Sequence, residues 1–385
     1  MKMLGIIAEY NPFHNGHLYQ ITQAKKKSGA DFVIAVMSPN YVQCGEPAIF
    51  DKYCRTKMAL RNGIDLVIEL PVIFATSSAQ YFAQAAINIL KATWIVDAIS
   101  FGTESEDLEP LIELAHTKNE FDIKKEIQSG KSYTAAFSNY IKNNRPQLQK
   151  FLQPNNILAI EYLSAMEKIN WHPQIFNVHR KSCPHDKNEL ADKFSSGRAI
   201  RNAIYKNIDI QDFIPKNCID FMPKEFAHID NASNIFHYLI SQKNFTNELL
   251  GINEGLENRI IKSAQNNFLI SEIVSHANST RYTSSRIKRI ILHAILGIKK
   301  DLVKSCQPQY LRILGFRKDS QVILKMLDKN LPLITNIKHI SRIKNQSALE
   351  IIKKEIEATD IYFNFIRSQN FFPTNFEYQQ PIVVL

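Results

Sequence analysis

Short apolar runs alternate with amphipathic segments over the first hundred residues. A strand buried on both faces is continuously apolar, whereas a surface helix repeats its apolar positions every three to four residues. The predicted strands are Met3–Ala8, Phe32–Met37, Leu66–Glu69 and Ala98–Phe101, the last closed by Gly102. The predicted helices are His17–Lys27, Asp51–Asn62 and Ser78–Leu90. This alternation predicts an α/β fold with a Rossmann-like, parallel, doubly wound sheet.

Beyond residue 104 the pattern becomes mostly helical. Residues 106–170 predict helices, with a turn at Gln153–Asn156 before the amphipathic run Ile157–Ile169. Ile175–His179 predicts one more strand, and two serines predict the start of a helix over Ser195–Tyr205. Strand signals fade from about residue 206. We therefore expect a catalytic, nucleotide-binding domain over 1–205 and a basic, mostly α-helical domain over 206–385; 385 residues suffice for both.

The charge balance of the chain is its least ordinary bulk property. Lysine and arginine exceed aspartate and glutamate by ten, and the isoelectric point is near 9.2. Such an excess favours a polyanionic partner, with RNA as the first candidate. A merely basic surface would give the same count, so charge alone leaves both alternatives open.

The cysteines and the apolar runs indicate the cellular compartment of the protein. The five cysteines are scattered and form no CxxC pair; they are Cys44, Cys54, Cys183, Cys218 and Cys306. This disfavours a zinc site or a disulfide framework and favours a reducing cytosol. The N-terminus reaches polar residues too soon for a signal peptide, and no apolar run is long enough to span a bilayer. We expect a cytoplasmic protein with no membrane segment.

The strongest local motif is His14-Asn15-Gly16-His17, which opens a predicted helix directly after the first strand. In a parallel sheet this position lies on the ligand-binding rim. Helix N-terminal N–H groups, here those around Asn15–Leu18, receive phosphate well, and Gly16 allows close approach. Two imidazoles on one helical turn can stabilise charge on departing pyrophosphate. The alternatives are a pair that only caps the helix, or a metal site, for which no third ligand is spaced nearby.

A second phosphate motif is predicted at Phe194–Arg201. Its serines, Ser195 and Ser196, and the helix that follows can cradle phosphates while Arg201 or Arg198 neutralises them. A turn of this kind alone is more often only a helix cap. Combined with HxGH after the first strand, it resembles the nucleotidyltransferase superfamily, whose members adenylate substrates and release pyrophosphate.

A closer resemblance covers residues 5 to about 316. The segments GIIAEYNPFHNGH, AVMSPNYVQCGEPAIFDKY, GIDLVIELP and SFGTE are similar, in order, to the tRNA(Met) cytidine acetate ligase family, as are PNNILAIEYL, residues 180–186, SSGRAIR, TSSRIKRIILHAIL and YLRILGF. The resemblance implies that the chain activates acetate with ATP as acetyl-adenylate. It further implies acetylation of the exocyclic amine of the wobble cytidine in elongator tRNA(Met). Mg²⁺ is expected to arrive with the ATP, since no carboxylate cage for it is visible.

The same resemblance implies which residues bind ATP, with His14 and His17 as the catalytic pair. The implied set is Ile7, Ala8, Glu9, Tyr10, Asn11, Pro12, Phe13, His14, Asn15, Gly16, His17, Leu18, Tyr19, Gln20, Gly102, Asn155 and Arg180, to which the second motif adds Ser195, Ser196 and Arg201. Asn156 is the alternative to Asn155. Pro39 and Cys44 depart from the family pattern, which usually has Gly in the first segment and Arg at the second position. Lys52 or Arg55 could compensate for that Arg, and a nucleophilic Cys44 lacks a partnering base.

A basic stretch in the C-terminal half is the predicted tRNA contact. Its candidate residues are Arg281, Arg286, Lys288, Arg289 and Arg312, interleaved with Tyr282, Tyr310 and Phe316. Cations suit phosphate contacts and aromatic rings suit base stacking, although such a run can also be a solvated face. Two rival functions remain: a small-molecule adenylyltransferase of coenzyme biosynthesis, and a non-catalytic RNA-binding protein.

Overall fold

The computed structural model describes residues 1–121, 133–181, 190, 193–253, 255–303, 306–327, 331–366 and 373–385. The family-like segment 180–186 is therefore described only to Lys181, and Cys183 lies outside the described residues. Within them, no helix is both long and apolar enough to cross a membrane.

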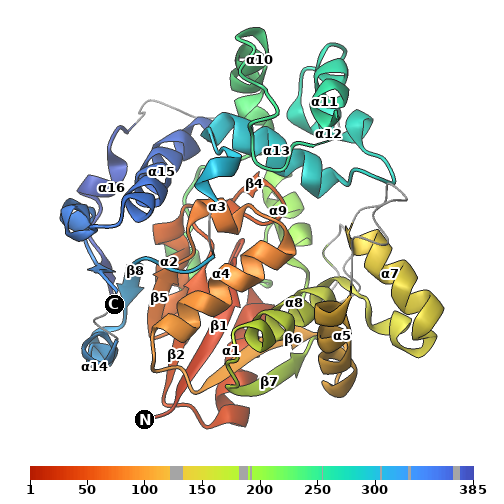
Figure 1. Ribbon diagram of the computed structural model, residues 1–385. Coiled ribbons are helices and arrows are strands. Elements are labelled where there is room, and N and C mark those ends of the chain that lie inside the picture. The colour runs from red at the N-terminus through yellow and green to blue at the C-terminus, as the bar shows by residue number, and fades with distance from the viewer. Residues whose placement is uncertain are drawn as a thin grey trace.

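One eight-stranded sheet forms the centre of the molecule (Figure 1). Its strands are β1 (Met3–Ala8), β2 (Phe32–Met37), β5 (Leu66–Glu69), β6 (Ala98–Thr103), β7 (Gln174–His179), β8 (Leu311–Phe316), β9 (Leu333–Ile334) and β10 (Val383–Val384). The order is β10-β8-β5-β2-β1-β6-β7, with β9 beside β8. Strands β5, β2, β1, β6 and β7 pair in parallel, so the predicted Rossmann-like core is confirmed. A small hairpin, β3 (Tyr41–Val42) with β4 (Glu46–Pro47), follows β2 and was not predicted.

Helices cover both faces of this sheet. In the first half they are α1 (Asn15–Ser28), α2 (Lys52–Arg61), α3 (Val72–Ala75), α4 (Ala79–Ala92), α5 (Glu109–Glu120), α7 (Tyr133–Asn144), α8 (Pro154–Lys168) and α9 (Gly197–Tyr205). Alternate strand residues belong to different cores: Ile34 packs with α4 and α8, whereas Val33 packs with α1, α2 and α9. This is the two-face alternation of a strand buried on both sides.

The second half of the chain supplies both a helical cap and part of the sheet. Its helices are α10 (Ser233–Ser241), α11 (Leu256–Ala264), α12 (Ile270–Ala277), α13 (Ser284–Leu296), α14 (Val322–Met326), α15 (Gln346–Tyr362) and α16 (Phe376–Gln379). In Figure 1, α10 to α13 lie above the sheet, while α14 to α16 lie at its β8 edge. Helices therefore dominate this half, as the sequence predicts.

Two local expectations are wrong. Strand signals do not end at residue 206, because β8 pairs antiparallel with β5 and extends the main sheet. The apolar run in β8 is too short to distinguish a strand from a buried helix turn by its pattern. The predicted turn at Gln153–Asn156 is instead the beginning of α8, with Pro154 in the first turn, where its missing N–H costs nothing.

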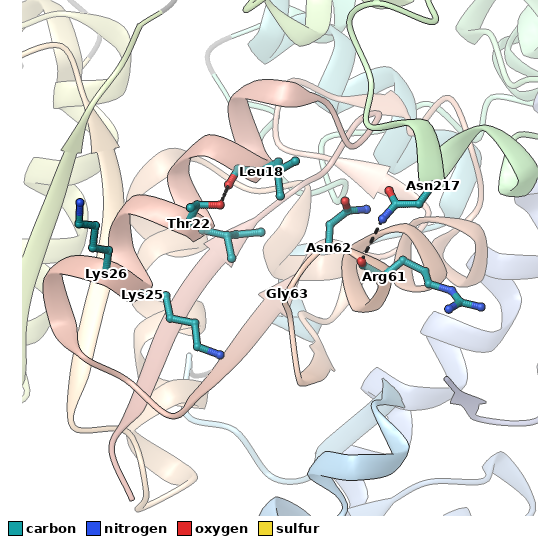
Figure 2. Close-up of a pocket in the computed structure, with 9 residues that line it drawn as sticks. Leu18, Thr22, Lys25, Lys26, Arg61, Asn62, Gly63 and Asn217 are labelled. Atoms are coloured by element: carbon teal, nitrogen blue, oxygen red, sulfur yellow. Dashed lines mark hydrogen bonds between the residues drawn. The ribbon is translucent and has the colours of Figure 1, made fainter.

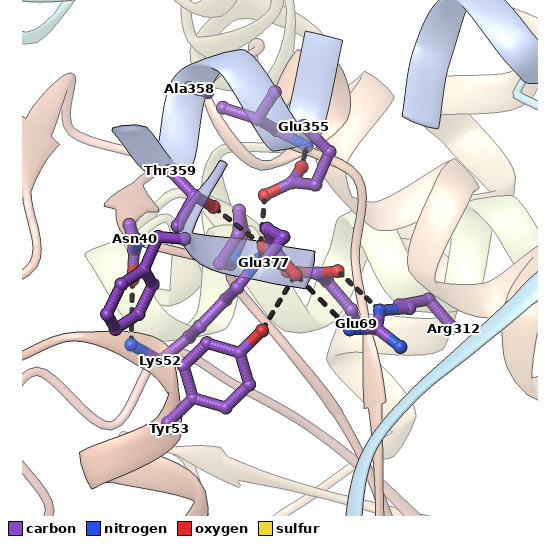
Figure 3. Close-up of polar contacts among 12 residues, drawn as sticks. Asn40, Lys52, Tyr53, Glu69, Arg312, Glu355, Ala358, Thr359 and Glu377 are labelled. Atoms are coloured by element: carbon purple, nitrogen blue, oxygen red, sulfur yellow. Dashed lines mark hydrogen bonds and ion pairs between the residues drawn. The ribbon is translucent and has the colours of Figure 1, made fainter. Parts of the chain in front are cut away.

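A buried cluster of ion pairs ties the two halves together (Figure 3). Lys52 of α2 forms ion pairs with Glu69 of β5 at 2.5 Å, with Glu355 of α15 at 3.4 Å, and with Glu377 of α16. Arg312 of β8 pairs with Glu377 at 3.2 Å. Burial alone would raise the pKa of Glu377, but Lys52 and Arg312 outweigh it and lower that pKa to about 2. The cluster is therefore a closed structural unit, and its three carboxylates surround an ammonium group rather than a site for a metal ion.

Candidate active site

Helix α1 begins at the histidine motif. His14 is the N-cap residue, and its Nδ1 accepts a hydrogen bond from the backbone N–H of Gly16 at 3.0 Å. The Nδ1 atom of His17 accepts from the backbone N–H of His14 at 3.3 Å. The two rings stack with their centroids 3.8 Å apart. The pair therefore caps the helix, but each ring uses only one nitrogen to do so.

Both imidazoles are held neutral. Burial, assisted by Arg180 and Arg201, lowers the pKa of His14 to about 3. Burial also lowers the pKa of His17 well below its usual value. A neutral ring whose Nδ1 accepts a hydrogen bond carries its proton on Nε2. Each histidine can therefore donate Nε2–H to a phosphate oxygen.

The expectation that backbone N–H groups of Asn15–Leu18 bind phosphate is wrong, because each already has a partner. The Asn15 N–H donates to the carbonyl of Phe213, and the Gly16 N–H donates to the His14 ring. The N–H groups of His17 and Leu18 both donate to the His14 carbonyl. Gly16 is required for a different reason, since a Cβ there would lie 2.8 Å from Cε1 of His14. The side chains of the histidines, and not the backbone, are the donors at this helix end.

Free backbone donors occur instead at the N-terminus of α9. The Ser196 hydroxyl caps this helix by accepting from Ala199 N–H at 3.1 Å, so the serine is committed to capping. Among the described residues, the first-turn N–H groups of Gly197 and Arg198 have no hydrogen-bond partner. A Cβ on Gly197 would lie 3.2 Å from the carbonyl of Asn11 and 3.6 Å from the His14 ring. The second motif thus brings a helix N-terminus against the first.

A small pocket of about 40 Å³ opens beside the histidines. The described residues that line it are His14, Gly16, His17, Tyr19, Gln20, Gly102, Val178, His179, Arg180, Lys181 and Phe194. A Cβ on Gly102 would lie 3.5 Å from the Arg180 side chain, an ordinary contact distance, so Gly102 and Arg180 are neighbours in the pocket. Arg180 donates to Oδ1 of Asn155 at 3.0 Å. The pocket therefore gathers predicted residues from α1, from β6 and from the end of β7 at the carboxyl ends of the strands, and Asn155 at the start of α8 contacts it through Arg180.

The two asparagines after Pro154, Asn155 and Asn156, make different contacts. Asn155 contacts Arg180 at the edge of the pocket. Asn156 is 1% exposed, and its Oδ1 accepts from the backbone of Glu104 at 2.9 Å. The geometry therefore favours Asn155 over Asn156 as the residue near a nucleotide.

Several residues of the predicted ATP-binding run support the pocket without lining it. Phe13 is in the core, and the Asn15 side chain donates to the carbonyl of Asp212 at 2.8 Å. Asn11 accepts from Ile49 N–H through its side chain at 2.8 Å. Tyr10 has a positive φ of 48°, packs edge-on against His17, and buries a hydroxyl that has no partner among the described residues. The others that do not line the pocket are Ile7, Ala8, Glu9, Pro12, Leu18, Asn155, Ser195, Ser196 and Arg201.

Four lining residues were not assigned to ATP from the sequence: Val178, His179, Lys181, which lies in the family-like segment 180–186, and Phe194, which opens the second motif. Lys181 lies over the Tyr19 ring at 4.9 Å, and Phe194 packs edge-on against the same ring at 5.6 Å. The signal that could have found His179 and Lys181 is their position at the end of β7, beside Arg180 on the ligand rim.

A larger and more open groove of about 520 Å³ lies on the other side of α1 (Figure 2). Its charged residues are Lys25, Lys26 and Arg61, and Asn217 closes one side by donating to the Arg61 carbonyl at 3.2 Å. The groove follows the C-terminal half of α1, where the helix dipole is negative and disfavours anions. Despite its size it lacks the imidazoles and the free helix N-terminus, so we assign the phosphates to the smaller pocket.

The predicted tRNA-binding residues separate in the structure. Arg281 is exposed and Arg286 is half-buried, and both guanidinium groups lie over the ring of Tyr282. Arg312 is 3% exposed and belongs to the ion cluster, so its assignment to tRNA is wrong. The aromatic residues Tyr282, Tyr310 and Phe316 are all buried, which removes them as base-stacking platforms. From sequence alone Arg312 looks like a surface cation. Its burial depends on the pairing of β8 with β5, which the sequence does not show.

Neither Lys52 nor Arg55 compensates for the missing arginine at Cys44. Lys52 is committed to the ion cluster. Arg55 is fully buried and donates to the carbonyls of Glu9 at 2.6 Å and Phe50 at 2.9 Å. Burial raises the pKa of the Cys44 thiol far above its usual value, so it does not supply a thiolate nucleophile.

The chain was compared with known proteins. A family model described as HIGH Nucleotidyl Transferase matches residues 1–375. A relative from Thermoanaerobacter sp., named tRNA(Met) cytidine acetate ligase, is 40% identical over 384 residues, covering 94% of this chain and 95% of its own. One from Caldanaerobacter subterraneus with the same name is 36% identical over the full length of both chains. Crystal structures of Thermotoga maritima TmcAL, bound with alpha-thio ATP and apo, superpose over both full chains with TM-scores of 0.90 and 0.91 at 31% identity.

The resemblance read from the sequence is therefore confirmed over the whole chain. The family model, the relatives and the solved structures agree with one another, and one of those structures is bound with an ATP analogue. This chain belongs to the tRNA(Met) cytidine acetate ligase family of HIGH nucleotidyl transferases.

Proposed function

We propose that the protein is an ATP-dependent ligase that acetylates the exocyclic N4 of the wobble cytidine in elongator tRNA(Met), through acetyl-adenylate. The observation that carries the proposal is the stacked pair of neutral imidazoles at the start of α1, each with Nε2–H available as a donor. The relatives named tRNA(Met) cytidine acetate ligase supply the acid and the acceptor. A tRNA substrate is consistent with a cytoplasmic location of the enzyme.

In the first step an acetate oxygen attacks the α-phosphorus of ATP, and the bond to the β-phosphate breaks. Negative charge grows on pyrophosphate as it leaves. His14 and His17 donate Nε2–H to that charge, and the free N–H groups of Gly197 and Arg198 add a second set of donors. Fixed neutral donors in a buried site stabilise this charge without reorganising during the reaction.

Arg180 and Asn155 lie on the other side of the pocket, next to Gly102. Burial lowers the pKa of Arg180, yet an arginine remains charged at neutral pH. We assign Arg180 to the phosphates, and Gly102 with Asn155 to the nucleoside, because glycine allows close approach and the amide can hydrogen-bond. The orphaned Tyr10 hydroxyl is a further polar atom that a ligand beside His17 could satisfy.

Mg²⁺ would enter with ATP. No carboxylate is among the described residues that line the pocket, so the protein offers no dedicated cage there. The buried Glu69, Glu355 and Glu377 are occupied by Lys52. The donors present fit a metal ion held by phosphate oxygens and water, which would neutralise the phosphates.

In the second step the N4 amine of the cytidine attacks the acetyl carbon, and AMP leaves as the acetyl–phosphate bond breaks. A cytidine amine is a weak nucleophile, so positioning contributes strongly to the rate. Arg281 precedes α13 and Arg286 lies in its first turn, and we assign both to tRNA phosphates.

The decisive experiment combines purified protein, ATP, isotopically labelled acetate and elongator tRNA(Met), followed by mass spectrometry of the nucleosides. We expect labelled N4-acetylcytidine at the wobble position only. A matched tRNA with uridine at that position should gain no label. Acetate-dependent exchange of pyrophosphate into ATP tests the first step alone. Its absence would defeat the ligase proposal and favour a non-catalytic RNA-binding protein, whereas turnover of a small acceptor but no tRNA would favour the coenzyme-type enzyme.

A further inference from the structure

The β3–β4 hairpin and helix α13 meet backbone to backbone at the rim of the sheet. Gly45, at the hairpin turn, has φ of 84°, and a Cβ there would lie 2.4 Å from the backbone nitrogen of Arg289. The Lys288 ammonium pairs with the Glu46 carboxylate, and the Arg289 guanidinium donates to the carbonyl of Gln43 at 3.2 Å. Burial lowers the pKa of Arg289 to about 10. Lys288 and Arg289 are thus directed at the hairpin and not at open solvent.

Arg201 connects this hairpin to the nucleotide pocket. Its guanidinium donates to the Asn11 carbonyl at 2.7 Å, next to the histidine motif. A Cβ on Gly197 would lie 3.6 Å from both Arg201 Nη1 and the His14 ring, so these two groups are neighbours. The same guanidinium charge acts on His14 and on Glu46. Arg201 is therefore a charged neighbour shared by Glu46 and by His14.

Glu46 is ionised and reachable. Burial would raise its pKa, but Lys288 and Arg201 outweigh that effect and keep the pKa below its usual value. Its side chain is 23% exposed. The other ionisable groups that interact with Glu46 or its neighbour Cys44 are Glu9, Arg201, Lys288, Tyr205 and Arg289. A carboxylate has about four acceptor positions, of which Lys288 and the Cys44 thiol use two.

We propose that Glu46, oriented by Lys288, binds the exocyclic amine of the acceptor cytidine and takes its proton during acetyl transfer. This inference rests on the proposed function. A carboxylate accepts a hydrogen bond from the N4 amine of cytosine, whereas uracil presents a carbonyl oxygen there and would be repelled. A residue with this property would select a cytidine as well as activate it.

The bonds and protons of the acetyl transfer are all accounted for with Glu46 as the base. The N4 nitrogen forms a bond to the acetyl carbon, and the bond from that carbon to the AMP oxygen breaks. AMP leaves as an anion and needs no proton. The nitrogen must lose one proton, which passes to the Glu46 carboxylate and then to water. General-base assistance of this kind contributes about 10²- to 10⁴-fold in rate.

The test separates the two half-reactions in the full-length Glu46→Gln variant. Glutamine keeps the shape of the side chain but cannot accept the proton. We expect acetate-dependent pyrophosphate exchange within about twofold of wild type, and acetyl transfer to tRNA(Met) reduced by about 10²-fold or more. The transfer defect should persist when synthetic acetyl-adenylate is supplied. Lys288→Met, which removes the orienting charge, should reduce transfer by a smaller factor and also spare exchange.

Glu248→Gln is the matched control, because Glu248 forms an exposed ion pair with Lys299 and neither residue lines the pocket. It should leave both half-reactions unchanged. Transfer by Glu46→Gln within a few-fold of wild type would overturn the proposal. A parallel loss of exchange, transfer and melting temperature would also overturn it, showing that the ion pair only joins the hairpin to α13. If wild-type protein itself shows neither half-reaction, the proposed function fails first.

Discussion

The histidine pocket and the Lys52 ion cluster are both buried and polar, yet they are constructed in opposite ways. In the pocket, His14 and His17 are three positions apart, neutral, and each leaves one ring nitrogen uncommitted. In the cluster, Lys52 and Glu355 are 303 positions apart, and the ammonium group is enclosed by carboxylates (Figure 3). One region keeps donors available for a ligand, whereas the other satisfies its charges internally.

This difference separates function from stability. A neutral donor costs far less to bury than a charge and is ready for charge that appears only during reaction. A buried charge is tolerable only with its partners in place, and removing one leaves the others unpaired. Changes in the pocket should therefore affect rate more than folding, and changes in the cluster should do the reverse.

The largest expected effect is on stability. Lys52→Met leaves three buried carboxylates around an apolar side chain, which should lower the free energy of unfolding by about 3–5 kcal/mol. Urea denaturation monitored by circular dichroism measures it. Lys299→Met, which removes an exposed ion-pair partner, is the control and should be indistinguishable from wild type. Equal stabilities for the two variants would mean that the cluster does not hold the halves together.

The next effect is on catalysis. His17→Ala removes one Nε2–H donor, and loss of such a donor should raise the barrier for pyrophosphate exchange by about 2–4 kcal/mol. The measurement is acetate-dependent exchange at saturating ATP, with unfolding followed in parallel. His116→Ala, on the exposed surface of α5, serves as control. An unchanged exchange rate would remove the histidine pair from the chemistry.

A pH titration distinguishes the two regions further. Because the pKa of His14 falls to about 3 on folding, the unfolded chain binds the additional proton between its ordinary value near 6.5 and about 3. Stability contributed by neutral His14 is therefore present above pH 6.5 and declines as the pH falls, by at most about 1.4 kcal/mol per unit. His14→Asn, which can still cap α1, should flatten this slope. An unaltered slope in urea titrations from pH 7 to pH 4 would contradict the assignment.

The smallest effect concerns the tRNA surface. Arg286→Ala should weaken tRNA binding a few-fold and reduce the slope of log affinity against log salt by about one. Lys325→Ala, on α14 at the opposite end of the molecule in Figure 1, is the matched control and should leave the slope unchanged. Filter binding at several salt concentrations measures both. If Lys325→Ala had the larger effect, the tRNA surface would have to be reassigned.

The sequence by itself determined the features that depend on neighbouring residues. Strands β1, β2 and β5 begin and end where their apolar runs do, and the caps at His14 and Ser196 follow from local side-chain chemistry. The family resemblance likewise came from short segments, and the comparisons confirmed it. Helix starts and buried strands are set by interactions within a few residues, so a linear pattern displays them.

Tertiary structure alone decided what required partners distant in the chain. The pairing of β8 with β5 buries Arg312, and the contact of α13 with the hairpin directs Lys288 toward Glu46. The tertiary structure also determined that the free backbone N–H donors lie on α9 and not on α1. Each of these outcomes depends on which segments pack together, and a cation destined for a buried carboxylate has the same appearance in sequence as one that contacts RNA.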